Sequence, residues 1–289
     1  MVAIWSKFAE RALGEGRIKI GVVAPASRMS PEVPDKVIAL AKRLYGERAP
    51  EIVFHPQCLA SSGHFAGDNQ TRAAAFIDVA NDPDFDVLWC ARGGYGANRI
   101  AEYVLPALTE AAKAKIYLGY SDFGFLLAPL YGAGIGTCVH GPVAQEIQRE
   151  GGEAAIARVL SWLIDRDPAA LEPSLQETPG AIAFNITVLS QMLGTPLQPD
   201  LAGRVLMLEE VSEALYRIDR SLFHITSNPE IRKVTGIRLG RCSLIPENEP
   251  DFGQTAEQVA RHWCEVSGIP FLGPADIGHD VANKLVPFG

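Results

Sequence analysis

The chain has 289 residues, of which 47% are hydrophobic, so it carries enough apolar material for one large domain or two ordinary ones. Its formal net charge is −8 and it has no long basic run, which argues against nucleic acid or an anionic membrane as a partner. No stretch approaches the roughly 20 apolar residues of a membrane helix, and the start lacks the pattern of a signal peptide, so we expect a cytoplasmic protein with a peptide or small-molecule substrate.

The first half of the chain alternates short β-branched runs with segments of helical periodicity. The pattern predicts strands at 18–27, 51–56, 85–91, 115–120 and 134–142, and helices at 31–47, 69–82, 97–108 and directly after Ser121. Such alternation is typical of an α/β fold with a mostly parallel sheet. The polar loops APAS, ARGGYG, GYSD and VHGP would then meet at the carboxyl edge of the sheet, where binding sites form.

The segment 166–180, RDPAALEPSLQETPG, is rich in proline and polar residues, and we interpret it as a linker. It divides the chain into an N-terminal domain, 1–165, and a smaller C-terminal domain, 181–289. In the second domain the pattern predicts strands at 204–210 and 234–244 and helices at 216–225 and 251–268.

The cysteines are odd in number and widely spaced, and none forms a C-x-x-C pair: Cys58, Cys90, Cys138, Cys242 and Cys264. This spacing fits buried thiols in a reducing compartment better than a disulfide framework or a zinc site.

Ser121 lies in LGYSDF, between a predicted strand and a predicted helix. The segment matches the first half of the nucleophile elbow G-x-S-x-G, but Phe123 stands where the second glycine would be. A helix start offers free N–H groups that can hold an oxyanion. Ser121 or Asp122 could equally be an ordinary helix N-cap, and this segment alone favours that interpretation.

A serine nucleophile needs a base, and an imidazole base needs an orienting carboxylate. His140 in VHGP and His279 in DIGHDV are both candidates for the base, and the sequence pattern does not choose between them. Glu209 and Glu210 end a predicted strand, and either could face inward, or both could mark an exposed strand end.

The segment RGGYG follows a strand, but it lacks the spacing G-x-G-x-x-G, so we do not expect nucleotide binding there. Its paired glycines allow a close approach of the backbone, which could supply an oxyanion N–H.

Several segments, in this order and spacing, resemble the LD-carboxypeptidase family: AGDNQTR through RGGYGANR, LGYSD, HGP, VLMLEE and GHDVANK. These are serine peptidases that include muramoyltetrapeptide carboxypeptidases and microcin-immunity peptidases. The resemblance covers nearly the whole chain, about 18–289. It implies a flavodoxin-like N-terminal domain, a smaller β-rich α/β C-terminal domain and a homodimer.

The resemblance also implies site residues. It makes Ser121 the nucleophile, Glu209 the orienting carboxylate and His279 the base, and so selects among the candidates that the pattern left open. The oxyanion would be held by the backbone N–H groups of Asp122 and Gly94. Further contacts to substrate are expected from the same loop and its surroundings, at Arg92, Gly93 and Tyr95, with Arg99 as another possible partner for an anion.

The activity so implied is release of the terminal D-alanine from a cytoplasmic murein tetrapeptide through an acyl-enzyme, without a metal or organic cofactor. The segment 166–180 holds no aromatic residue, which favours this branch over the microcin-immunity branch, where the region is aromatic. Two alternatives remain: a peptidase for peptidyl or aminoacyl nucleotides, and a non-catalytic protein that binds peptides or nucleotides.

Overall fold

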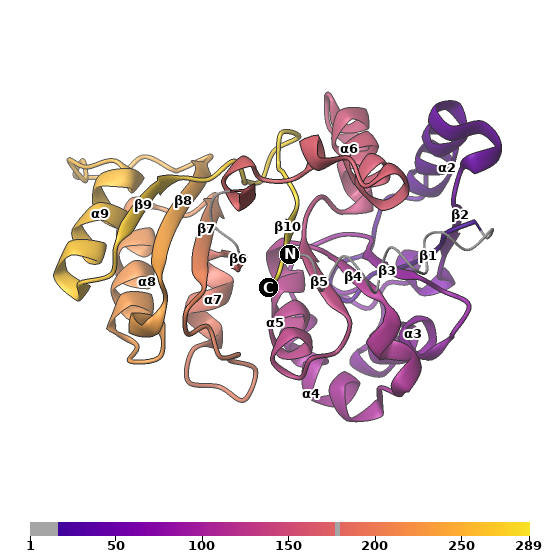
Figure 1. Cartoon of the computed structure of the whole chain (residues 1–289), viewed down its shortest axis with the longest axis horizontal. Coiled ribbons are helices and arrows are strands. Elements are labelled where there is room, and N and C mark those ends of the chain that lie inside the picture. Colours follow the sequence, from indigo (N-terminus) through magenta and orange to yellow (C-terminus); the bar gives the residue numbers. More distant parts are fainter. Residues whose placement is uncertain (1–16, 177–179) are drawn as a thin grey trace.

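The computed structural model describes residues 17–176 and 180–289, which form two sheets side by side, the first mostly parallel and the second parallel (Figure 1). The first sheet has the strand order β10-β5-β4-β3-β1-β2. Its strands are β1 (Lys19–Val23), β2 (Glu51–Phe54), β3 (Val87–Cys90), β4 (Ile116–Gly119), β5 (Thr137–His140) and β10 (Val286–Pro287). All of these pairs are parallel except β10 with β5. The order 2-1-3-4-5 is that of flavodoxin-like folds, which confirms the predicted fold class.

Helices cover both faces of the first sheet. On one face lie α2 (Val33–Tyr45) and α6 (Gly152–Asp165), whose apolar residues share a core with those of β1 and β3. On the other lie α3 (Asn69–Asn81) and α5 (Gly124–Gly132). Because parallel strands covered on both faces direct their carboxyl ends to one edge, the loops after β1, β3 and β4 meet there.

The segment 97–108, predicted to be helical, is helical in the structure, but it is not one regular helix. The structure has three short pieces instead: η3 (Ala97–Arg99), α4 (Ala101–Val104) and η4 (Leu105–Ala107). Pro106 lacks the N–H that would continue a regular helix at this point. At the other end, the Ala97 N–H is bound by the Asp122 carboxylate, 2.8 Å away, which fixes where η3 begins.

The second sheet has the order β6-β7-β8-β9, all parallel. Its strands are β6 (Ala181–Asn185), β7 (Val205–Val211), β8 (Gly236–Ser243) and β9 (Phe271–Pro274), and its helices are α7 (Ile186–Met192), α8 (Leu215–Ser227) and α9 (Ala256–Ser267). The helix predicted from 251 begins at 256, because the Thr255 side chain caps it in a capping box with Gln258.

One apolar core joins the two sheets, since Leu126 of α5 belongs to the same buried cluster as Leu189 of α7 and Leu222 of α8. The last residues of the chain return to the first sheet, where Val286 pairs with His140. Part of the predicted linker is ordered as η8 (Pro168–Ala170) and η9 (Pro173–Gln176), while 177–179 lie outside the described residues. The domain boundaries at 165 and 181 stay a prediction.

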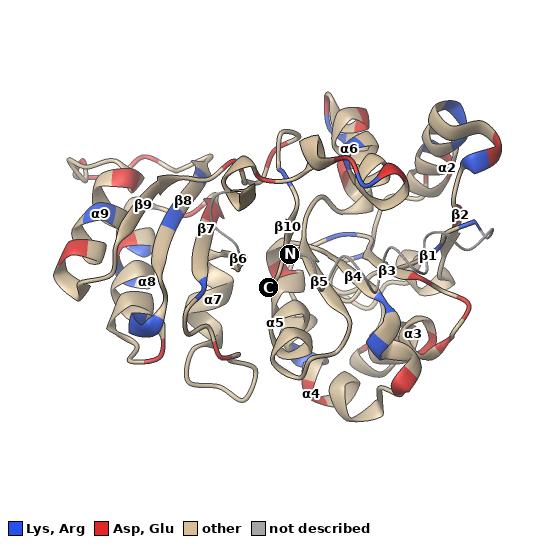
Figure 2. Cartoon of the chain, viewed as in Figure 1, with Lys and Arg blue, Asp and Glu red and all other residues tan. Residues whose placement is uncertain are grey.

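We call each sheet, with the helices that pack on it, a unit: the first unit holds the six-stranded sheet and the second unit the four-stranded sheet. Acidic and basic residues are interspersed along the helices of both units (Figure 2). No helix in 17–176 or 180–289 is long and apolar enough to cross a membrane.

Candidate active site

Ser121 lies on a strained turn between β4 and α5. Its φ is 61°, in the left-handed region that a non-glycine residue occupies at a cost of about 1–3 kcal/mol. At Gly119 a Cβ would lie 2.6 Å from the ring of Phe123, so the turn folds the buried Phe123 back onto a position that only glycine can fill. The result is a sharp strand-to-helix turn that resembles a nucleophile elbow without the second glycine.

The turn places backbone N–H groups at the start of the helix. Its first backbone hydrogen bonds are donated by Phe123, to the Tyr120 carbonyl, and by Gly124. The Asp122 N–H precedes them, at the helix start, where N–H groups lack partners within the helix. The N-cap positions belong to Tyr120 and Phe123, so the interpretation of Ser121 or Asp122 as the N-cap is wrong.

The Asp122 side chain connects this turn to the RGGYG loop. It is buried, and its carboxylate accepts the Ala97 N–H just after that loop. Burial raises the pKa of Asp122 to about 6, although the N–H groups of Ala97 and Gly96 and the charge of Arg72 act in the opposite direction.

Two of the three glycines of the loop, Gly93 and Gly94, pass close to Ser121 and Ser27. A Cβ on Gly93 would lie 3.2 Å from Ser121 Oγ, so the loop backbone runs beside the serine hydroxyl. Gly94 has a φ of 115°, and a Cβ there would lie 2.3 Å from Ser27 Oγ. The close contact and the positive φ at Gly94 both require glycine, whereas a side chain at Gly93 would need Ser121 to shift by a few tenths of an ångström.

The side chains of this loop and of Arg99 just after it have different surroundings. Tyr95 lines the pocket at Ser121 and is half exposed. Arg92 is exposed and donates to the Arg28 carbonyl, 3.0 Å away. Arg99 is exposed and lies over the ring of Phe65. Of the predicted substrate contacts with side chains, the structure thus brings Tyr95 to the pocket.

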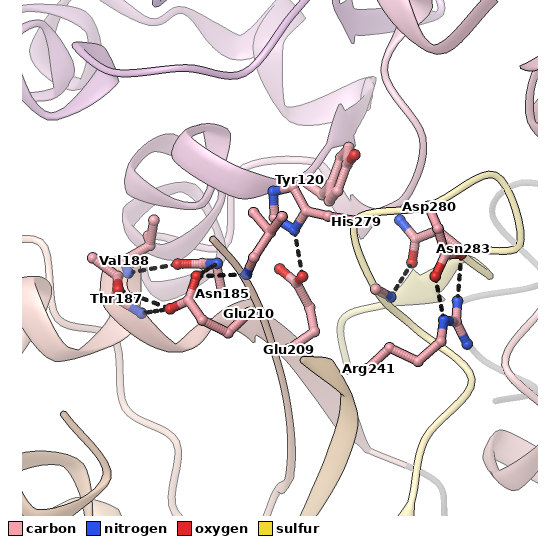
Figure 3. A network of polar contacts seen from close by, with 12 residues as sticks. Tyr120, Asn185, Thr187, Val188, Glu209, Glu210, Arg241, His279, Asp280 and Asn283 are labelled. Carbon is pink, nitrogen blue, oxygen red and sulfur yellow. Dashed lines mark hydrogen bonds and ion pairs between the residues drawn. The ribbon is translucent and has the colours of Figure 1, made fainter. Parts of the chain in front are cut away.

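Glu209 and His279 form a buried pair (Figure 3). His279 Nδ1 donates to Glu209 Oε2, and the Glu209 side chain is fully buried. Burial alone would lower the pKa of His279, but the Glu209 carboxylate raises it above its ordinary value. Burial raises the pKa of Glu209 despite the opposing effect of His279. The pair fixes the tautomer of the imidazole with Nε2 free of the proton.

A bulge in β8 creates the space for this pair. Between the positions opposite Leu208 and Glu210, β8 carries one extra residue relative to β7. A Cβ on Gly240 would lie 2.6 Å from the Ile277 side chain and 3.0 Å from Glu209 Cβ, so only glycine lets the 277–279 segment lie against Glu209. Our sequence analysis missed Gly240, although a glycine inside a predicted strand is a signal of a bulge or of a close approach.

Glu210 has a different set of partners. Its carboxylate accepts from Asn185 Nδ2 at 2.6 Å, from the Thr187 N–H at 2.9 Å and hydroxyl at 2.7 Å, and from the Val211 N–H at 2.9 Å. It therefore ties β7 to the start of α7 and lines the pocket with its acceptors already occupied.

His140, the other candidate for the base, is almost fully buried and packs against the ring of Tyr120. Burial, and the nearby His279, lower the pKa of His140 to about 3, so it is neutral at physiological pH. The structure places His279, and not His140, in the wall of the pocket with Ser121.

The pocket has a volume of about 510 Å³ and lies between the two units. Ser121, Gly94 and Tyr95 line it from the first unit, and Thr187 and His279 from the second. In the described part of the chain no hydrogen bond joins Ser121 to His279. A hydroxyl, a carboxylate-bound imidazole and helix-start N–H groups around one pocket are the components of acyl transfer.

The described residues contain no group of three or more His, Cys, Asp or Glu side chains placed to hold a metal ion. All of the cysteines are free thiols. The prediction that they are buried is confirmed for Cys58, Cys90, Cys138 and Cys264 but is wrong for Cys242, which is half-buried near the end of β8.

Comparison with known proteins identifies the family of the chain. The model of the LD-carboxypeptidase N-terminal domain matches residues 20–141, and that of the C-terminal domain matches 181–289. The murein tetrapeptide carboxypeptidase of Pseudomonas aeruginosa is 26% identical over 287 residues, which are 94% of this chain and 91% of that protein.

Many solved structures share the fold. One is muramoyltetrapeptide carboxypeptidase from Oxalobacter formigenes, with a TM-score of 0.74 and 22% identity over 93% of each chain. Another is the microcin C7 self immunity protein MccF in complex with aspartyl sulfamoyl adenosine, with a TM-score of 0.76 and 18% identity over 94% of this chain and 91% of that one. From the matches to both of its domain models, the chain belongs to the LD-carboxypeptidase family of peptidases.

Proposed function

We propose that this protein is a serine LD-carboxypeptidase that releases the terminal D-alanine of murein tetrapeptide, by hydrolysing its bond to the L-centre of a diamino acid. One observation carries the proposal: Ser121, on its strained turn, shares a single pocket with the imidazole of the buried Glu209–His279 pair. The name of the Pseudomonas aeruginosa relative supports the choice of substrate.

In the first half-reaction Ser121 Oγ attacks the scissile carbonyl while His279 Nε2 takes the serine proton. Glu209 keeps the other ring proton on Nδ1 and stabilises the imidazolium that forms. The N–H groups of Asp122 and Gly94 donate to the oxyanion. Collapse of this intermediate breaks the C–N bond, and His279 gives its proton to the departing amine of D-alanine.

In the second half-reaction a water molecule attacks the acyl-enzyme. His279 takes a proton from the water, the ester bond to Ser121 breaks, and the serine oxygen recovers its proton as the tripeptide leaves. No step requires a metal or an organic cofactor.

Further parts of the proposal concern binding and context. Tyr95 and the Gly93 backbone would contact the peptide, and Arg92 would lie near the entrance beside them. The enzyme would act in the cytoplasm as a homodimer, a state that light scattering of the purified protein would measure.

The experiment is an assay of D-alanine released from purified murein tetrapeptide, with the same peptide ending in L-alanine as the control substrate. We expect release from the D-peptide alone, and no effect of a chelator. No release from the D-peptide, or equal release from both, would contradict the proposal; inhibition by the chelator would require a metal and a different role for His279.

A second candidate is hydrolysis of a peptidyl or aminoacyl nucleotide, favoured by the fold shared with MccF. Competition between the two substrates separates these activities, because the ratio of their kcat/KM values gives the preference directly. A serine-directed probe separates both from a binding protein: measurable peptide affinity without labelling of Ser121 would indicate binding without catalysis.

A further inference from the structure

The loop 277–283, which we call the base loop, carries His279 and is held from two directions. From its own unit, Arg241 of β8 pairs with Asp280, with Nη2 2.9 Å from Oδ1 (Figure 3). Arg241 Nη1 also lies 2.6 Å from Oδ1 of Asp276, which directly precedes the loop. The Asn283 side chain also accepts the Gly278 N–H at 3.1 Å, which closes the loop on itself.

From the other unit, two arginines bind backbone carbonyls of the base loop. Arg149 Nη1 donates to the carbonyl of His279 itself. Arg158 Nη1, on α6, donates to the carbonyls of Val281 at 2.8 Å and Asn283 at 3.1 Å. The residue proposed as the base is thus fixed at its own backbone by the unit that carries Ser121.

The contacts of Arg149 continue to the nucleophile. Arg149 Nε lies 2.9 Å from Glu146 Oε2 as an ion pair, and Glu146 Oε1 accepts the Tyr120 hydroxyl at 2.6 Å. Tyr120 directly precedes Ser121, and its ring centroid lies 4.7 Å from that of His279. A continuous chain of contacts therefore runs from Tyr120, beside the nucleophile, through Glu146 and Arg149 to the backbone of His279. The ring of Tyr120 also contacts the ring of His279 directly.

We propose that Arg149, Glu146 and Tyr120 are positioning residues that set the imidazole of His279 relative to the hydroxyl of Ser121 across the two units. The inference rests on the proposed function, because it takes these two residues as base and nucleophile. Neither Arg149 nor Glu146 lines the described pocket, so their effect passes through His279 and not through contact with substrate.

Loss of this positioning affects the rate more than binding. A displacement of about 1 Å between reacting groups lowers the rate about 10²-fold. We therefore expect Arg149→Met to lower kcat by about 10- to 100-fold and to change KM by less than about threefold. Arg149→Lys keeps a cationic donor near Glu146 and should recover part of the rate.

Glu146→Gln tests whether the charge of Glu146 acts on the imidazole of His279. The charged and titratable groups around His279 come from five elements and from the base loop. They are Glu209 and Glu210 of β7, Glu146 and Arg149 at η7 (Ala144–Gln148), His140 of β5, Tyr120 after β4, Arg241 of β8, and Asp280 of the base loop, which pairs with Arg241. Burial lowers the pKa of His279, and Glu209, Glu210 and Glu146 raise it.

The glutamine keeps an oxygen acceptor for the Tyr120 hydroxyl but removes one of these charges. The pKa of His279 should therefore fall, and the acid limb of kcat/KM should move to lower pH. A side chain that only supported the fold would lower the unfolding temperature and leave that limb in place.

The experiment measures kcat, KM, the pH profile and thermal unfolding for each variant, with His279 titrated by NMR and its signal assigned from His279→Gln. Arg43→Met is the matched control, because Arg43 forms an exposed ion pair with Glu153 between α2 and α6. It should leave kcat and the titration of His279 unchanged. If Arg149→Met does not fold, Tyr120→Phe removes only the hydroxyl and should lower kcat in the same direction.

The proposal is overturned if folded Arg149→Met or Tyr120→Phe keeps the parent kcat, or if Glu146→Gln leaves the titration of His279 unmoved. Failure of the proposed function is a separate result: the parent protein would release no D-alanine, while the NMR titrations would still report whether Glu146 acts on His279.

Discussion

Gly94→Ala is predicted to disable the oxyanion site while leaving the protein folded. The added Cβ would lie 2.3 Å from Ser27 Oγ and 2.9 Å from Ser27 Cβ, whereas ordinary contacts begin at 3.4 Å. The loop and Ser27 would have to separate by about 1 Å, a displacement that lowers a rate about 10²-fold when it misplaces a catalytic group. The φ of 115° adds backbone strain of about 1–3 kcal/mol for alanine.

Loss of one oxyanion donor lowers kcat by about 10²- to 10³-fold, so the expected loss for Gly94→Ala lies in that range. KM should change little, because the donor acts on the transition state more than on the bound substrate. The assay is D-alanine release at several substrate concentrations, with thermal unfolding measured on the same samples.

Gly134→Ala is the matched control, since Gly134 also has a positive φ of 65° but no atom within 4 Å of an added Cβ. It should lower stability slightly and leave kcat unchanged. Replacing Ser27 by glycine in the Gly94→Ala background removes both close contacts and should restore part of the rate. If folded Gly94→Ala keeps a kcat within about threefold of the parent, the Gly94 N–H is not an oxyanion donor and the reasoning is wrong.

Three further predictions concern the pair and the turn. The acid limb of kcat/KM should have an apparent pKa above 6.5, because Glu209 raises the pKa of His279 and only the neutral imidazole accepts the serine proton. A pH profile with its acid limb below 6.5 would contradict this. Glu209→Gln should lower kcat about 10⁴-fold with the fold retained in circular dichroism, since an amide does not hold the imidazole in the required tautomer; a loss under tenfold would count against the role. Asp122→Ala should lower the free energy of unfolding by about 1–3 kcal/mol in denaturant, because it leaves the buried Ala97 N–H unpaired. Asp122→Asn keeps an acceptor and should recover most of that loss. Equal stability of the two variants would show that the Asp122–Ala97 hydrogen bond does not stabilise the fold.

Much of the first unit could be predicted from the sequence because its signals are local. Short β-branched runs alternate with helical periodicity, and a parallel sheet places the following loops at one edge. These signals together predict that Ser121 and the RGGYG loop lie near each other. The break at Pro106 was also local, and weighing its missing N–H would have predicted it.

Local sequence signals do not choose between Glu209 and Glu210, or between His140 and His279. Alternation along β7 does not separate Glu209 from Glu210, because both faces of the strand are covered and both side chains are buried. His140 and His279 lie near each other only because the chain end returns to pair β10 with β5. The family resemblance, and not the pattern, selected the pair that the structure brings together.

The contacts that hold His279 and Glu209 in place could not be predicted from the sequence. Arg149 binds a backbone carbonyl 130 positions away. Every residue has such a carbonyl, so the sequence does not indicate which one an arginine binds. Gly240 was visible as a glycine inside a strand, but what it makes room for is a segment nearly 40 residues later, whose approach depends on the second sheet being formed.

The most direct test of the account is D-alanine release from murein tetrapeptide by Ser121→Ala beside the parent. Alanine keeps the backbone at this turn and removes only the attacking oxygen, so the variant should unfold at nearly the parent temperature. The account predicts a fall in kcat of roughly 10⁴- to 10⁶-fold. Release of D-alanine by folded Ser121→Ala at the parent rate would contradict the serine mechanism.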